Sequence, residues 1–139
     1  MKKTIRLLSL ILVVIICLSF SSIAAESRAS LYISRCSGSI GKDDEGLIIG
    51  FSITGTNIMT NIGATRVEIK NASGRTVATY RYTDDGYSYM MASNTFSYAA
   101  SITYEDAVPG NEYYAVIYFK AGNSNGSDTD TVTTGLATA

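Results

Sequence analysis

The segment from Asp84 to Asn94 concentrates side chains that could bind a ligand. It carries two carboxylates, two phenols and two thioethers where a turn of about two to five residues would suffice. Long loops often carry function, and methionine contacts adapt to varied partners. The alternative is a crossover between two sheets whose Tyr and Met side chains fill the end of the core. The candidate binding residues in this segment are Asp84, Asp85, Tyr87, Tyr89, Met90 and Met91.

Tyrosine is the anomaly of the composition, with 10 residues in a chain that has no Trp. The alternation in residues 113–121 places Tyr113 on one side of a strand and Tyr114 and Tyr118 on the other. If the first side is core, Tyr114 and Tyr118 lie on a sheet surface, and both join the candidate binding residues. An exposed phenol offers a rigid ring for stacking and a hydroxyl for specificity. The alternative is cross-strand tyrosine pairing that only stabilises the sheet.

The sequence contains few side chains in arrangements that could catalyse a reaction. The chain has no His, which removes the usual general base near neutral pH and the commonest metal ligand. Asp84 and Asp85 are adjacent, so in a strand they would point to opposite faces. The acidic residues at 43–45, 128 and 130 match no calcium-binding loop. We expect no enzyme, no metal and no cofactor. The least favoured alternative is a glycan hydrolase that uses Asp84 or Asp85.

Residues 1–25 have the pattern of a secretory signal peptide. A basic start precedes an apolar run over residues 7–20, and small residues then lead to cleavage after Ala24 or Ala25. The run is short for a membrane-spanning helix, which needs roughly 20 apolar residues. The alternative is an uncleaved N-terminal anchor. We expect a secreted, extracellular protein whose domain covers residues 26–139, with no stable membrane insertion of the mature chain.

Removal of the signal peptide changes the charge and the cysteine count. It leaves 8 basic residues against 12 acidic ones, a net charge of −4. An acidic chain without a basic block argues against nucleic acid as a partner. Cys36 alone remains, so no disulfide can form within the mature chain. It is either a small buried apolar residue or a link between chains, and the oligomeric state stays open.

The mature chain alternates apolar and polar residues in short runs separated by Gly, Asn, Asp and Ser clusters, which is typical of half-buried strands. This spacing predicts an all-β fold, a single antiparallel β-sandwich of about seven strands. The predicted strands cover residues 31–40, 47–54, 64–70, 76–82, 95–105, 113–121 and 129–134.

Residues 107–126 resemble the end of a fibronectin type III domain, where a Pro-Gly turn leads into a strand that opens with Tyr. Pro109 and Gly110 form the turn, and the resemblance implies that Tyr113 is the corner tyrosine, with its ring in the core and its hydroxyl bonded to upstream backbone. Phe51 stands in for the buried Trp usual in the second strand. The resemblance implies a fibronectin type III-like or immunoglobulin-like sandwich and carries no function.

The chain as a whole also resembles a family of small, single-domain proteins of unknown function that Gram-positive anaerobes secrete. Three stretches carry this likeness, at residues 33–38, 51–56 and 87–91. It implies secretion and a sandwich fold, and it brings no functional residue.

Together these features predict a secreted, non-enzymatic binding module that recognises an extracellular ligand, a glycan or a protein, through its tyrosine-rich face and the 84–94 loop. The alternative is a structural or surface-assembly protein whose copies associate through strand edges.

Overall fold

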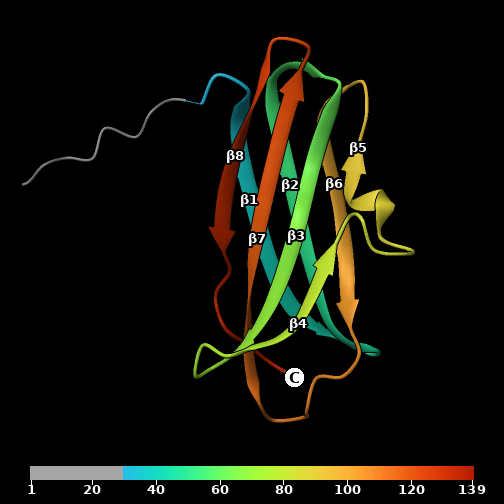
Figure 1. Ribbon diagram of the computed structural model, residues 1–139. Coiled ribbons are helices and arrows are strands. Elements are labelled where there is room, and N and C mark those ends of the chain that lie inside the picture. The colour runs from blue at the N-terminus through green and yellow to red at the C-terminus, as the bar shows by residue number, and fades with distance from the viewer. Residues whose placement is uncertain (1–29) are drawn as a thin grey trace, which may run out of the picture.

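The computed structural model describes residues 30–139, which form two antiparallel sheets packed face to face (Figure 1). The prediction of an all-β sandwich of about seven strands is confirmed. The predicted signal peptide, residues 1–25, lies outside the described residues. No helix within the described range is long and apolar enough to cross a membrane.

All seven predicted strands are present, and two strands of two residues each join them. The elements are β1 (Ile33–Asp43), β2 (Gly46–Met59), β3 (Asn61–Asn71), β4 (Thr76–Arg81), the 3-10 turn η1 (Ser88–Met90), β5 (Met91–Ala92), β6 (Thr95–Tyr104), β7 (Glu112–Asn123), β8 (Gly126–Thr133) and β9 (Ala137–Thr138).

The smaller sheet has the order β1-β2-β6, with β2 in the centre. Leu47, Ile49, Phe51 and Ile53 of β2 are buried, and the residues between them are half-buried. This period of two is the physical signature of a strand with one face on a core. It explains why β2 could be predicted from the sequence.

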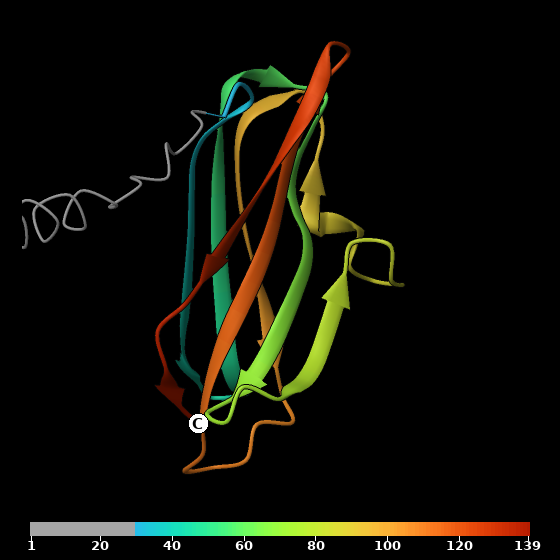
Figure 2. The ribbon, with the colours of Figure 1, turned by 60° about the vertical axis from the view of Figure 1, so that its left-hand side comes forward.

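The larger sheet has the order β4-β3-β7-β8. β5 pairs with β3 at Ile62 and Gly63, beyond the stretch that pairs with β4, and β9 pairs with the start of β7. Figure 2 shows this sheet along one side of the sandwich, with β4 and β8 at its two edges. β3 and β7 therefore form the centre of the sheet that carries Tyr114 and Tyr118.

Aromatic contacts join the two sheets inside the core. The rings of Phe51 and Phe119 lie 6.3 Å apart edge to face, and those of Tyr104 and Tyr113 lie 5.8 Å apart in the same arrangement. Such pairs are worth about 0.5–1.5 kcal/mol beyond the burial of their area. The only cysteine of the described residues, Cys36, is half-buried in β1, where burial and then Asp130 raise the pKa of its thiol to about 12.

Two apolar residues near the starts of β1 and β6 lie outside the core. Leu31 is 78% exposed because β1 begins only at Ile33. Phe96 is 53% exposed, since the pairing of β2 with β6 shifts register between Thr54 and Met59 and the first residues of β6 run past the core. Strand period alone does not reveal where a pairing is interrupted.

Candidate functional site

The 84–94 segment closes the open side of the sandwich. Asp84 forms a turn, in which its Oδ2 accepts the backbone N–H of Arg81 at 2.9 Å and its backbone oxygen accepts the N–H of Tyr87 at 3.1 Å. The chain then makes η1 and pairs with β3 through β5. Met90 at the end of η1 is fully buried. Much of this segment therefore fills the space between β3 and β6, and we call the segment the plug.

Gly63 allows this plug to approach β3 closely. A Cβ on Gly63 would overlap the backbone carbonyl oxygen of Met90 and approach the Cα of Met91 to 2.8 Å. Backbone atoms cannot move aside as the end of a side chain can. The pairing of β5 with β3 therefore requires a residue without a side chain at position 63.

A cluster of tyrosines runs from β4 across the segment to β6. The ring centroids of Tyr80 and Tyr87 are 5.1 Å apart, and those of Tyr87 and Tyr89 are 6.2 Å apart. The Tyr89 hydroxyl donates to the backbone oxygen of Ser101 at 3.1 Å, and the Tyr98 hydroxyl donates to the backbone oxygen of Tyr89. These side chains cover part of the outer edge of β6, the kind of edge through which strands of other chains can add.

Burial raises the pKa of two phenols of this cluster, Tyr80 and Tyr89. It is the largest cause that raises the pKa of Tyr80 to about 12, followed by Tyr87. Burial also raises the pKa of Tyr89 above its ordinary value. A phenol of ordinary pKa, about 10, is already neutral near pH 7, so the raised pKa extends the pH range in which both hydroxyls stay neutral.

The structure brings the candidate residues together at two separate places. Asp84, Asp85, Tyr87, Tyr89, Met90 and Met91 lie together in the plug, where Met90 offers no surface, Tyr87 and Met91 are half-buried, and the other three are exposed. Tyr114 and Tyr118 are half-buried residues of β7 in the larger sheet, with side chains opposite to the buried Tyr113 and Ala115.

The outer face of the larger sheet brings Tyr118 together with two arginines. The register sets Arg66 of β3 between Arg81 of β4 and Tyr118 of β7, and Tyr118 opposite Thr131 of β8. All four belong to one row across the sheet. Neighbouring strands lie about 4.8 Å apart, so these side chains can share one ligand.

Arg66 is held flat against Tyr118. Its Cζ lies 3.9 Å from the centre of the ring, which is cation–π stacking. Glu68 braces the pair, with Oε1 3.1 Å from Arg66 Nε and Oε2 3.4 Å from the Tyr118 hydroxyl. Lys70 Nζ lies 3.6 Å from the same Oε2. The Nε of Arg66 is covered from solvent and lacks hydrogen-bond geometry with any described atom, so the ion pair with Glu68 is electrostatic only.

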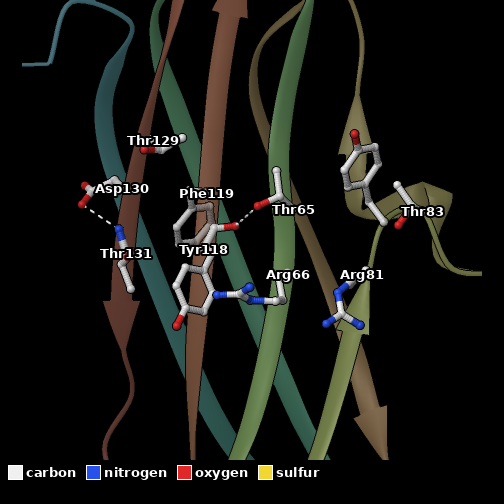
Figure 3. Close-up of a pocket in the computed structure, with 10 residues that line it drawn as sticks. Thr65, Arg66, Arg81, Thr83, Tyr118, Phe119, Thr129, Asp130 and Thr131 are labelled. Atoms are coloured by element: carbon white, nitrogen blue, oxygen red, sulfur yellow. Dashed lines mark hydrogen bonds between the residues drawn. The ribbon is translucent and has the colours of Figure 1, made fainter.

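A shallow hollow of about 360 Å³ opens over this row, and we call it the Tyr118 hollow. Figure 3 shows Arg66 reaching over the Tyr118 ring, with Arg81 on β4 at the far side of Arg66. The described part of the chain provides no acidic partner within ion-pair distance of Arg81. The lining residues are Thr65, Arg66, Arg81, Tyr82, Thr83, Tyr118, Phe119, Thr129, Asp130 and Thr131.

The arginines of the Tyr118 hollow were not among the residues singled out from the sequence. The signal that could have found them is the hairpin of residues 64–82, whose turn at 71–74 sets the outward-facing Arg66 opposite Arg81. The two arginines lie beside Tyr118 because β3 pairs with β7 in this register, and the alternation within single strands does not predict which strands pair.

The residues of the predicted corner lie at the other end of β7. Tyr113 is buried, and its hydroxyl accepts the backbone N–H of Val108 at 2.9 Å. Gly110 has a φ of +83°, and the exposed Pro109 precedes it in the turn. Phe51, the expected substitute for Trp, is 3% exposed in β2. These residues position the sheets and take no part in the hollow.

No protein-family model matches this chain, and neither does any curated protein or solved structure at the threshold for a significant match.

Proposed function

We propose that this protein is a secreted, non-enzymatic binding module that recognises an extracellular ligand through the Tyr118 hollow. The observation that carries the proposal is the guanidinium of Arg66 stacked on Tyr118 beside Arg81, which forms no ion pair within residues 30–139. Glu68 holds Arg66 and Tyr118 in place before any ligand arrives. A pre-formed polar surface of this kind loses little conformational entropy on binding.

The rest of the predicted binding surface has a secondary role in this proposal. The 84–94 segment follows Arg81 directly and its turn is bonded to the Arg81 backbone, so it positions the rim of the hollow. Tyr114 lies on the same sheet face but outside the hollow lining. The ligand contacts that we propose are therefore Arg66, Arg81 and Tyr118.

We also propose that residues 1–25 direct export and that the sandwich is of the fibronectin type III kind. In immunoglobulin constant domains the fourth strand joins the first sheet. Here β4 pairs with β3 in the second sheet, which supports the fibronectin type III alternative. The bond from Val108 to the Tyr113 hydroxyl supports a sandwich of this general kind, since a corner tyrosine also occurs in immunoglobulin domains.

The test is a glycan-array and cell-wall pull-down screen with the purified protein, compared with the Tyr118→Ser variant. We expect saturable binding that Tyr118→Ser weakens about tenfold or more, because the variant removes both the ring and the hydroxyl that the ligand would contact, and a loss of about 1.4 kcal/mol is tenfold in affinity. Tyr114→Ser is the matched control, since it removes the same side chain from the same face and strand. It should bind like the unchanged protein.

Equal binding by both variants and the unchanged protein would overturn the assignment of the site. Absence of binding together with concentration-dependent oligomers would replace the proposal with assembly through strand edges. Turnover of a glycan that is lost on Asp84→Ala or Asp85→Ala would make the protein a hydrolase.

A further inference from the structure

Basic side chains predominate on the outer face of the larger sheet, although the whole chain has a net charge of −1. The two acidic residues of β8, Asp128 and Asp130, are in register with the buried Ala121 and Phe119 and so do not belong to this face. The basic residues of the described part are Arg35, Lys42, Arg66, Lys70, Arg75, Arg81 and Lys120. Four of them belong to outward positions on β3, β4 and β7: Arg66, Lys70, Arg81 and Lys120. Glu68 is the only acidic residue of these three strands apart from Glu112 at the start of β7.

Three acidic side chains lie near the hollow, and none of them forms an ion pair with Arg81 among the described residues: Asp84 accepts only the Arg81 backbone N–H. Glu68 forms ion pairs with both Arg66 and Lys70, so its single negative charge neutralises only one of these two positive charges. Asp130 lies at the rim, where its Oδ1 accepts the backbone N–H of Thr131 at 2.8 Å, and Figure 3 shows it pointing away from Arg66. Arg81 remains the exposed cation beside the stacked pair.

Hydroxyl groups supply the rest of the polar lining. Thr65 donates its hydroxyl proton to the backbone oxygen of Tyr118 at 3.2 Å, and its oxygen can still accept a hydrogen bond. The hydroxyls of Thr83, Thr129 and Thr131 have no partner among the described residues. The exposed aliphatic side chains that could anchor a peptide lie elsewhere, namely Leu31, Ile58, Val77, Val108 and Leu136.

We infer that the Tyr118 hollow binds a glycan that carries an anionic group, a carboxylate or a phosphate. Arg81 binds the anionic oxygens, and the sugar ring packs against the Arg66–Tyr118 pair, in which the guanidinium already covers one face of the Tyr118 ring. The threonine hydroxyls exchange hydrogen bonds with the ring hydroxyls. This inference rests on the proposed function, because it specifies the ligand of that same hollow. A guanidinium matches the geometry of two anionic oxygens, whereas a neutral sugar would leave Arg81 without a partner.

The experiment is calorimetric titration of the purified protein with trigalacturonate, and with galactotriose as its neutral counterpart. We expect trigalacturonate to bind at least about tenfold more tightly, as charge-assisted hydrogen bonds are roughly twice as strong as neutral ones. Arg81→Gln should weaken trigalacturonate binding about tenfold and leave any galactotriose binding unchanged. Arg35→Gln is the matched control, because it removes an exposed arginine from β1 in the other sheet.

Two further ligands identify the source of the charge. A phosphomannan fragment that binds in place of trigalacturonate, with the same loss on Arg81→Gln, would support the inference and assign the group to phosphate. A hexaglutamate peptide that binds as tightly as the best glycan would overturn it in favour of an acidic protein. Arg81 is exposed, so the variant should fold, and its far-ultraviolet circular dichroism would verify this.

Failure of this inference can be told apart from failure of the proposed function. If galactotriose binds as tightly as trigalacturonate and Tyr118→Ser abolishes both, the hollow is the site but its ligand is neutral. If trigalacturonate binds and neither Arg81→Gln nor Tyr118→Ser weakens it, the hollow is not the site and both proposals fail. If none of these ligands binds, the assignment to an acidic glycan is overturned.

Discussion

Two adjacent tyrosines of β7 differ in what their hydroxyl groups do. Tyr113 is 4% exposed, and its hydroxyl accepts the backbone N–H of Val108. Tyr114 points to the opposite face, and its hydroxyl makes no hydrogen bond to a described residue. The same chemical group is therefore structural at one position and free at the next, because strand residues alternate between faces.

This difference predicts unequal effects of removing each hydroxyl. Tyr113→Phe should lower the free energy of unfolding by about 1–2 kcal/mol, since it leaves a partly buried N–H without an acceptor. Tyr114→Phe should change it by less than about 0.5 kcal/mol, as is usual for surface substitutions. Denaturant-induced unfolding of both variants measures the difference. Equal losses would show that the bond to Val108 does not stabilise the fold.

At the scale of elements, the attachment of the 84–94 segment depends on one contact with β3. β5 is only two residues long, and the backbone at Met90 and Met91 lies against Gly63. The tyrosine cluster and buried Met90 hold the rest of the segment. If a substitution in β3 disrupts this contact, we expect the whole 84–94 segment to detach together.

Gly63→Ala should therefore detach this segment or destabilise the domain by about 2 kcal/mol or more, in the range of other overpacked cores. Hydrogen exchange of the amides in residues 84–94 measures the detachment. Gly41→Ala is the control, because no atom lies within 4 Å of a Cβ placed there. Equal hydrogen-exchange rates of these amides in Gly63→Ala and Gly41→Ala would contradict the contact that we assign between β5 and Gly63.

The first described residues are attached to the start of β8 through Asp128. Its Oδ2 accepts the Ser30 hydroxyl at 2.6 Å and the backbone N–H groups of Leu31 and Tyr32 at 2.8 and 3.1 Å. The bond from Ser30 is the main cause that lowers the pKa of this carboxyl below its ordinary 3.8. The attachment is complete above pH 3.8 and is lost as the pH falls through the lower, folded-state pKa.

We predict that the amide chemical shifts of Leu31 and Tyr32 change on acidification with a midpoint below 3.8. Asp128→Asn should remove this titration and weaken the attachment at every pH. Asp130→Asn is the matched control, since among the described residues the Asp130 side chain bonds only to the backbone of Thr131. A midpoint at or above the ordinary value would contradict the assigned role of Asp128.

The central strands β2, β3 and β7 could be predicted because each has a buried apolar face of period two, and the more polar β8 could be predicted from its place between clusters of turn residues. β5 could not, because a strand of two residues has no period and forms only where Gly63 lets it approach. Tyr118 could be placed on a sheet surface from the alternation of β7. Its arginine neighbours depend on cross-strand register, which joins residues far apart in the chain.

At the scale of the whole molecule, the two sheets present different outer faces. The smaller sheet shows small side chains, with Ser37, Ser52 and Ala99 in one row. The larger sheet carries four of the seven basic residues of the described part, together with the stacked Arg66–Tyr118 pair and the hollow, whereas β1 of the smaller sheet carries Arg35 and Lys42. A ligand that needs charge and stacking should therefore meet only one of the two faces.

The most direct test of this account is an amide chemical-shift map of the protein titrated with the tightest-binding glycan from the array. The account predicts saturable changes centred on Arg66, Arg81 and Tyr118, extending to Thr129 and Thr131 of β8, with the β1-β2-β6 sheet unchanged. Changes centred on that smaller sheet, or on the 84–94 segment without Tyr118, would contradict it.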